Sequence, residues 1–184
     1  LSILWATLRP LRWADFQGQP DATSDAAAIT AYVISFEAEC GLGLLNFRVV
    51  SAFLPERSWV KTSLLLDREQ SPRALQHEQT HFDLSEVHVR RARQLLSELS
   101  NPCARLDTDF GVLVEPILRA DREAQDRYDR ETRHGIELGE QARVRLEDIL
   151  AKEPAYGPAQ RELALLHRER GAGLPGRAVG GGDR

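Results

Sequence analysis

The sequence is short of several residue types, and each shortage excludes a class of protein. Only two of its 184 residues are cysteine, too few for a small domain built on a network of disulfides. No apolar run is long enough to cross a bilayer. The formal net charge of −4 gives no electrostatic reason to expect nucleic acid or an anionic membrane as a partner. We therefore expect neither a transmembrane segment nor a nucleic-acid partner.

Methionine is missing altogether, and the chain begins with leucine. We interpret this as the loss of an N-terminal segment. A removed secretion signal would fit, as would a fragment of a longer chain. The two cysteines, Cys40 and Cys103, either form one disulfide in an oxidising compartment or remain reduced, and the sequence leaves both states open.

What is present suits one folded domain. A hydrophobic content of 42% in a chain of this length is enough for a single core and too little for two. We place this domain at residues 8–152. Residues 153–184 end in a stretch that is rich in glycine and charge and has little to bury, so we expect a weakly structured or flexible tail there.

Strand patterns come first in the chain and helix patterns second. Aromatic and β-branched residues alternate over 29–37 and 47–54, a glycine break at 41–43 separates the two, and 58–63 is a candidate further strand. Helical spacing of apolar residues predicts long helices over about 74–99 and 116–151, joined by a loop over 101–111. This order predicts an α+β fold, with a small N-terminal antiparallel or mixed sheet followed by two long helices. The apolar stripe of the first helix is Leu75, Phe82, Val89, Ala92, Leu96 and Leu99.

The first helix contains the pattern with the most specific chemistry, His77-Glu78-Gln79-Thr80-His81. Residues four apart lie on one face of a helix, so both imidazoles can bind a single Zn²⁺. A catalytic zinc takes three protein ligands and leaves one position for water, and a neighbouring carboxylate removes the proton as that water attacks a carbonyl. We therefore predict His77 and His81 as zinc ligands and Glu78 as the catalytic base.

The third zinc ligand is expected on the second helix. His134 and Glu131 are three residues apart, so both can face the same way, and His134 lies at the edge of the apolar stripe of that helix. We expect His134 to bind the metal, with Glu131 next to it or in the exchanged role. Tyr128 is a candidate donor to the developing oxyanion, against the alternative of a core tyrosine with a satisfied hydroxyl.

Several segments resemble a bacterial family of predicted secreted zinc-dependent proteases of the zincin type, which is catalogued mainly as a domain of unknown function. The resemblance covers roughly residues 10–150, and its segments are 11–18, Trp59-Val60-Lys61, 75–86 with Arg93, and 128–135. It implies a zincin-like fold, a peptide or protein substrate, and a secreted or periplasmic location. It also implies that 11–18 is the first strand. An edge strand above the metal would bind an extended substrate, and Trp59-Val60-Lys61 is the candidate for it, against the alternative of a tryptophan buried in the core of the sheet.

Two other functions stay open at this point. Another zinc amide hydrolase, for example an amidase that acts on cell-wall peptide, would use the same site. A zincin scaffold that serves as a binding module without catalysis would have no need of the Glu78 carboxylate. No residue pattern indicates a cleavage specificity or an oligomeric state.

Overall fold

A long antiparallel hairpin forms most of the sheet structure. The computed structural model describes residues 1–6, 8–42 and 44–132, with the backbone alone over 105–109. Strands β3 (Tyr32–Gly41) and β4 (Leu44–Phe53) pair in continuous register along their whole length. Strand β1 (Ile3–Leu4) pairs with the other edge of β4, which gives the order β1-β4-β3. The chain turns between β3 and β4, so the predicted break at 41–43 is confirmed.

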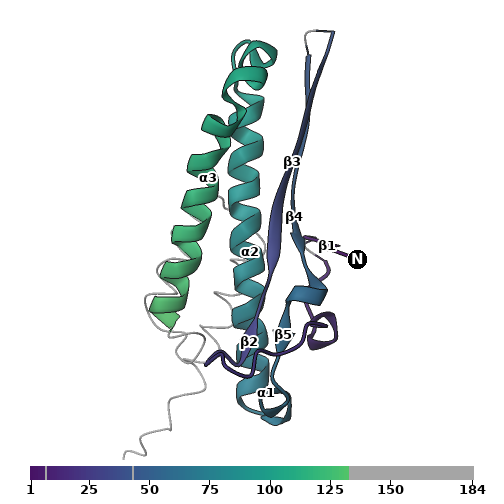
Figure 1. Cartoon of the computed structure of the whole chain (residues 1–184), viewed down its shortest axis with the longest axis vertical. Helices are drawn as coiled ribbons and strands as arrows, with labels where there is room; N and C mark the ends of the chain where they lie inside the picture. The colour runs from purple at the N-terminus through teal and green to yellow at the C-terminus, as the bar shows by residue number, and fades with distance from the viewer. Residues whose placement is uncertain (7, 43, 133–184) are drawn as a thin grey trace, which may run out of the picture.

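A second, two-stranded sheet lies at the end of the hairpin away from its tip (Figure 1). Strand β2 (Ala28–Ile29) pairs antiparallel with β5 (Trp59–Val60). The short 3-10 helix η2 (Pro55–Arg57) precedes β5, and the short helix α1 (Thr62–Leu66) follows it. The strand predicted at 58–63 is therefore confirmed only at Trp59 and Val60.

The segment 11–18, which the resemblance implied to be the first strand, is not a strand. Residues Trp13–Asp15 form the 3-10 helix η1, and the Asp15 carboxylate accepts a hydrogen bond from the backbone N–H of Arg12. The N–H of Gly18 donates to the carbonyl of Ser58 at 2.8 Å, and a Cβ at this glycine would lie only 2.9 Å from that oxygen. Close docking of this backbone on the turn before β5 explains the non-extended path.

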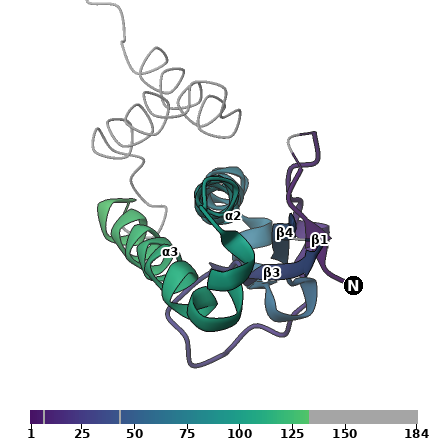
Figure 2. The same ribbon diagram turned by 90° about the horizontal axis from the view of Figure 1, so that it is seen from above.

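Two long antiparallel helices form the other layer. Helices α2 (Gln70–Ser97) and α3 (Pro102–Thr132) lie side by side, and α2 packs against both α3 and β4 (Figures 1 and 2). Strands come first and helices afterwards, and the sheets are small and antiparallel. The α+β prediction is thus confirmed.

The predicted loop over 101–111 is wrong, because α3 begins at Pro102. Asn101 has a φ of 51°, a left-handed conformation that asparagine tolerates between helices, and proline suits a first helical turn, where its missing N–H has no partner to lose. Gly111 lies inside α3. A glycine inside a helix costs about 1 kcal/mol of stability, and the free energy gained by packing the whole helix outweighs this cost. The predicted continuation to residue 151 and the predicted tail at 153–184 lie outside the described residues.

The core lies between α2 and the two sheets. One apolar cluster gathers around Phe53 and Phe82, and the second gathers around Val49 and Val89. The predicted stripe of α2 supplies both clusters: its four fully buried members are Phe82, Val89, Ala92 and Leu96, and Leu75 and Leu99 pack at the margins. This packing fixes the rotation of α2 about its axis and therefore the direction in which its polar residues point.

Cys40 and Cys103 form a disulfide with their Cα atoms 5.7 Å apart. It joins the end of β3, next to the tip of the hairpin, to the first turn of α3. Of the two states that the sequence left open, the oxidised one is present. None of the helices within the described ranges is both long and apolar enough to span a membrane.

Candidate metal centre

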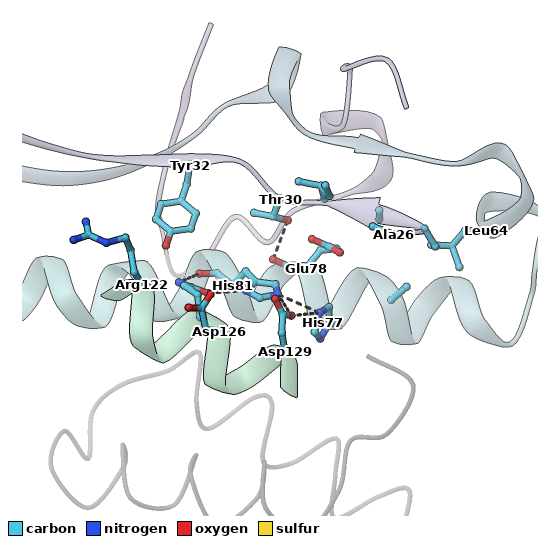
Figure 3. Close-up of a pocket in the computed structure, with 15 residues that line it drawn as sticks. Ala26, Thr30, Tyr32, Leu64, His77, Glu78, His81, Arg122, Asp126 and Asp129 are labelled. Atoms are coloured by element: carbon cyan, nitrogen blue, oxygen red, sulfur yellow. Dashed lines mark hydrogen bonds and ion pairs between the residues drawn. The ribbon is translucent and has the colours of Figure 1, made fainter. Parts of the chain in front are cut away.

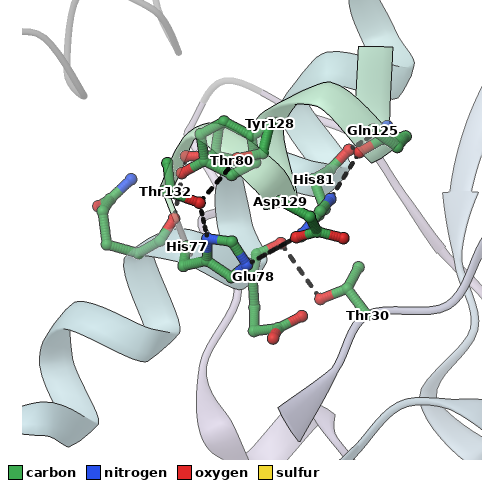
Figure 4. Close-up of polar contacts among 10 residues, drawn as sticks. Thr30, His77, Glu78, Thr80, His81, Gln125, Tyr128, Asp129 and Thr132 are labelled. Carbon is green, nitrogen blue, oxygen red and sulfur yellow. Dashed lines mark hydrogen bonds and ion pairs between the residues drawn. The ribbon is translucent and has the colours of Figure 1, made fainter. Parts of the chain in front are cut away.

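Helix α2 presents two imidazoles one turn apart. The Nε2 atoms of His77 and His81 lie 3.1 Å from each other, and the ring planes are nearly perpendicular, at 89°. Glu78 follows His77 on the neighbouring face and is only 6% exposed. Because the apolar stripe of α2 faces the sheets, the two histidines lie on the flank of the helix beside α3, and the Glu78 side chain points away from α3, toward Thr30 (Figure 4).

Helix α3 adds a carboxylate to the two imidazoles. Its antiparallel course brings Asp129, near its C-terminal end, opposite the first turns of α2. The Oδ1 atom of Asp129 lies 3.2 Å from Nε2 of His77 and 2.9 Å from Nε2 of His81 (Figure 4). These are the only His, Cys, Asp or Glu residues in the described part of the chain whose potential ligand atoms gather in a group of three.

The three atoms are spaced as a small cation requires. A four-coordinate Zn²⁺ with bonds of about 2.0–2.2 Å separates its ligand atoms by roughly 3.3 Å. The observed separations of 3.1, 3.2 and 2.9 Å are slightly shorter. Imidazole nitrogen and carboxylate oxygen are also both common zinc donors. The arrangement therefore fits a metal ion after only small outward movements of the side chains.

The electrostatics of the group show where a proton resides when no metal is bound. Burial lowers the pKa of His77 below its usual value. Burial also opposes protonation of His81, but the hydrogen bond and charge of Asp129 outweigh it and raise the pKa of that imidazole. Burial would raise the pKa of Asp129, yet hydrogen bonds from both histidines hold it well below the usual range. The Asp129 carboxylate thus favours a proton on the facing imidazole of His81, and a divalent cation would replace that proton.

The other ring nitrogen of each histidine also has a partner. Nδ1 of His77 lies 3.4 Å from Oγ1 of Thr132, whose hydroxyl donates to the carbonyl of Tyr128 at 2.8 Å. That oxygen can therefore only accept from His77, which it does when Nδ1 carries a hydrogen. Nδ1 of His81 lies 2.6 Å from Oε1 of Gln125. In both rings a hydrogen on Nδ1 leaves Nε2 as the metal-binding atom once Nε2 gives up the hydrogen that it donates to Asp129.

A cleft opens onto the two histidines and Asp129. It has a volume of about 550 Å³ and is walled by α2, by the C-terminal half of α3, and by residues 26–30 with β2 (Figure 3). Leu64 lines it near the His77 end, while Tyr32 and Arg122 line it at the other end (Figure 3). Glu78 also lines it. The candidate metal centre is thus open to a molecule from outside rather than sealed in the core.

The strand beside this cleft is not the predicted one. Trp59 and Val60 are buried and pair with β2, so they lie one strand away from the cleft. The prediction that Trp59-Val60-Lys61 forms the edge above the metal is therefore wrong, and β2 takes that place. The aromatic and β-branched character of residues 59–60 reflects burial rather than exposure at an edge.

The other predicted site residues are Tyr128, Glu131 and His134. Tyr128 is 1% exposed, and its ring stacks on His77, with centroids 5.0 Å apart and planes 17° apart. It does not line the cleft, so this geometry favours a packing role over donation to an oxyanion. Glu131 does not belong to the group of metal-binding atoms. His134 lies outside the described residues, and its role as a ligand stays a prediction.

Sequence reasoning missed Asp129. A signal for it exists, because polar residues recur at helical spacing along one side of α3, at 121, 125, 129 and 132. A solvent-facing helix shows the same spacing of polar residues, and only burial distinguishes the two cases. In the structure Asp121 and Thr132 are buried, which marks this side as facing inward.

The fold and the site together define an α+β protein with a candidate His-His-Asp metal centre in an open cleft. The chain belongs to the family described as a bacterial protein of unknown function, DUF922, whose model matches residues 13–135. The predicted resemblance to a bacterial family of unknown function is confirmed over that range, and the match itself carries no activity. Comparison with curated proteins and with solved structures found no match.

Proposed function

We propose that the protein is a zinc-dependent peptidase with a zincin-like active site. One observation supports this most directly: three ligand atoms from His77, His81 and Asp129 converge at the wall of an open cleft, beside the buried carboxylate of Glu78. A zinc bound only for structure usually has four Cys or His ligands and no open position. Three protein ligands facing a cleft are instead the arrangement of a catalytic zinc.

His77 and His81 would hold the ion through Nε2, and Asp129 would hold it through Oδ1. The sequence also predicts His134 as a ligand, and it would bind the ion in addition to these residues or in place of one of them. The bound ion would supply Lewis acidity, which polarises the scissile carbonyl and lowers the pKa of water. The protein supplies the rest, since Thr132 and Gln125 orient the two imidazoles from behind.

Glu78 is placed to act as the general base. Its carboxylate lines the cleft next to both histidines, and the Thr30 hydroxyl bonds its backbone carbonyl rather than its carboxylate. Glu78 would remove a proton from the attacking water, whose oxygen bonds to the carbonyl carbon. It would then return this proton to the amine nitrogen as the C–N bond breaks. A binding module without catalysis has no need for a carboxylate buried at this position.

The walls of the cleft suit an extended peptide. Strand β2 uses one edge to pair with β5, while residues 26–30 line the cleft. An extended chain that lies along this strand can bond its backbone and needs no particular side chain for affinity. An amidase acting on cell-wall peptide would use the same residues, and the choice of substrates in the test below separates the two activities.

We also propose that the protein works outside the reducing cytoplasm, in the periplasm or secreted. The Cys40–Cys103 disulfide supports this location, because disulfides persist in oxidising compartments and are rare in reducing ones.

The test compares the zinc-loaded wild type with Glu78→Gln on denatured proteins, a mixed peptide library and cell-wall peptide. Glu98→Gln is the matched control, since it makes the same substitution on the exposed residue that caps the C-terminal end of the same long helix. We expect the wild type and the control to cleave peptides, and Glu78→Gln to bind zinc normally but to be slower by about 10²–10⁴-fold. Equal rates for Glu78→Gln and wild type would show that Glu78 is not the base. Cleavage of cell-wall peptide alone would favour the amidase.

A further inference from the structure

The imidazole of His81 is held from behind by a side chain of α3. Nδ1 of His81 lies 2.6 Å from Oε1 of Gln125. The amide of Gln125 has its own fixed orientation, because its Nε2 donates to the His81 carbonyl at 3.0 Å and to Oδ1 of Asp121 at 3.2 Å. Oε1 therefore points at the ring and can only accept. Nδ1 must carry a hydrogen, so Nε2, which faces Asp129 and the cleft, is the nitrogen left to bind a metal once it gives up the hydrogen that it donates to Asp129.

Gln125 is oriented in turn by a buried acid. Asp121 is 5% exposed and lies one helical turn before Gln125. Its Oδ1 accepts from Gln125, and its Oδ2 accepts from the hydroxyl of Tyr32 on β3 at 2.6 Å. Burial and the neighbouring negative charge raise the pKa of Tyr32, so this hydroxyl remains a donor. Each hydrogen bond in the series from Tyr32 to His81 thus fixes the direction of the next one.

We propose that Tyr32, Asp121 and Gln125 form an orienting relay that holds His81 in its metal-binding tautomer. The relay connects the hairpin to the metal centre through side chains, since Tyr32 comes from β3, Asp121 and Gln125 from α3, and His81 from α2. The inference rests on the proposed metal site but not on peptidase activity. These three are positioning residues, because they act through His81 and not on a substrate.

The chemistry of ligand orientation supports this role. A histidine that binds a metal through Nε2 binds best when Nδ1–H has a fixed acceptor, because the ring is then oriented before the ion arrives. A tyrosine, an acid and an amide that merely satisfied buried polar groups would stabilise the fold without changing metal affinity. The experiment must therefore read metal affinity and fold stability separately.

The test measures the dissociation constant for Zn²⁺ by competition with a chromophoric chelator, and the visible absorption spectrum of the Co²⁺-loaded protein. Gln125→Leu removes the acceptor, and Gln94→Leu is the matched control at an exposed position of α2. We expect zinc affinity to fall by about 10–100-fold in Gln125→Leu and the cobalt spectrum to change, with both unchanged in the control.

Two further variants keep the test decisive if Gln125→Leu folds poorly. Tyr32→Phe removes only the first donor and should weaken zinc binding by less than Gln125→Leu. The exchange Asp121→Asn with Gln125→Glu keeps an acceptor for Nδ1 of His81 and restores the bonds among residues 32, 121 and 125, because the new amide donates to the new carboxylate and still accepts from Tyr32. It gives up only the bond from residue 125 to the His81 carbonyl. We expect this exchange to restore zinc affinity to within about threefold of wild type.

Equal zinc affinity and an identical cobalt spectrum in Gln125→Leu would overturn the relay. If Gln125→Leu does not fold, equal zinc affinity in Tyr32→Phe would overturn it, as would an exchange that binds zinc more than about tenfold more weakly than the wild type. A loss of thermal stability in Gln125→Leu or Tyr32→Phe without any change in zinc affinity would overturn it as well. A wild type that binds no zinc would instead refute the proposed function, and the relay with it.

Discussion

The two ends of the α2–α3 pair are held by different chemistry. At the hairpin tip, a covalent bond from Cys40 to Cys103 ties the first turn of α3 to the sheet. At the other end, α3 meets α2 through Asp129, whose Oδ1 faces two imidazole nitrogens. The first link needs no ligand, whereas the second needs a proton or a cation between its partners.

One end of the helix pair therefore contributes mainly to the stability of the fold, and the other end contains the residues of the proposed metal chemistry. Buried polar groups are costly unless each has a partner, and the end that contains His77 and Asp121 gathers several of them. The disulfide end lies beside an apolar cluster of Val49, Val89 and Leu96 and contains none of the proposed ligands. Because substitutions at distant sites act almost independently, changes at one end should leave the property of the other end intact.

The largest effect is expected from the ligands themselves. His77→Ala and Asp129→Ala should each abolish stoichiometric zinc binding, because two remaining ligands hold the ion too weakly. Elemental analysis after gel filtration in zinc-containing buffer measures this. His88→Gln is the control, as His88 lies on the same helix but outside the group of ligand atoms. If Asp129→Ala retained one zinc per chain, the third ligand would have to be sought elsewhere, with His134 first.

The next effect concerns the disulfide end. Replacing both Cys40 and Cys103 by serine should lower the free energy of unfolding by about 4 kcal/mol, since the bond closes a loop across a sequence separation of 63. Zinc affinity should change little. Urea unfolding and chelator competition on the same samples measure the two quantities. A large fall in zinc affinity would show that the two ends are coupled, contrary to the comparison.

The smallest effect concerns the pH dependence at the ligand end. Burial raises the pKa of Asp121, so the folded state binds its proton more tightly than the unfolded state does. The stabilisation from this group is complete below the usual carboxyl pKa of 3.8 and is lost as the pH rises through the raised value. Asp121→Asn cannot ionise, so the stability of the metal-free wild type relative to this variant should fall with rising pH. Urea midpoints from pH 4 to 7 test this, and a constant difference would contradict it.

Local patterns predicted several features correctly. The apolar stripe of α2 needs only helical spacing, and Phe82, Val89 and Leu96 are indeed buried on one side. The same spacing placed His77 and His81 together, since residues four apart in a helix are neighbours whatever surrounds them. Their 3.1 Å separation follows from this local geometry.

Contacts between segments far apart in the sequence explain the predictions that were wrong. The family resemblance implied a strand at residues 11–18, but this segment docks on the turn before β5 through Gly18. Of the two interpretations of Trp59, the edge residue is wrong and the buried residue is confirmed. In each case the residue contacts a partner far away in sequence, and no local pattern contains that partner.

The sequence by itself determined the helix that contains His77, Glu78 and His81, because period and propensity act within a few turns. Only the tertiary structure decided that Asp129 meets these histidines, that Gln125 orients one of them, and that β2 lines the cleft. The physical reason is that the rotation and offset of α3 against α2 are set by packing over the whole length of both helices. A shift of one residue along α3 would turn Asp129 away by about 100°.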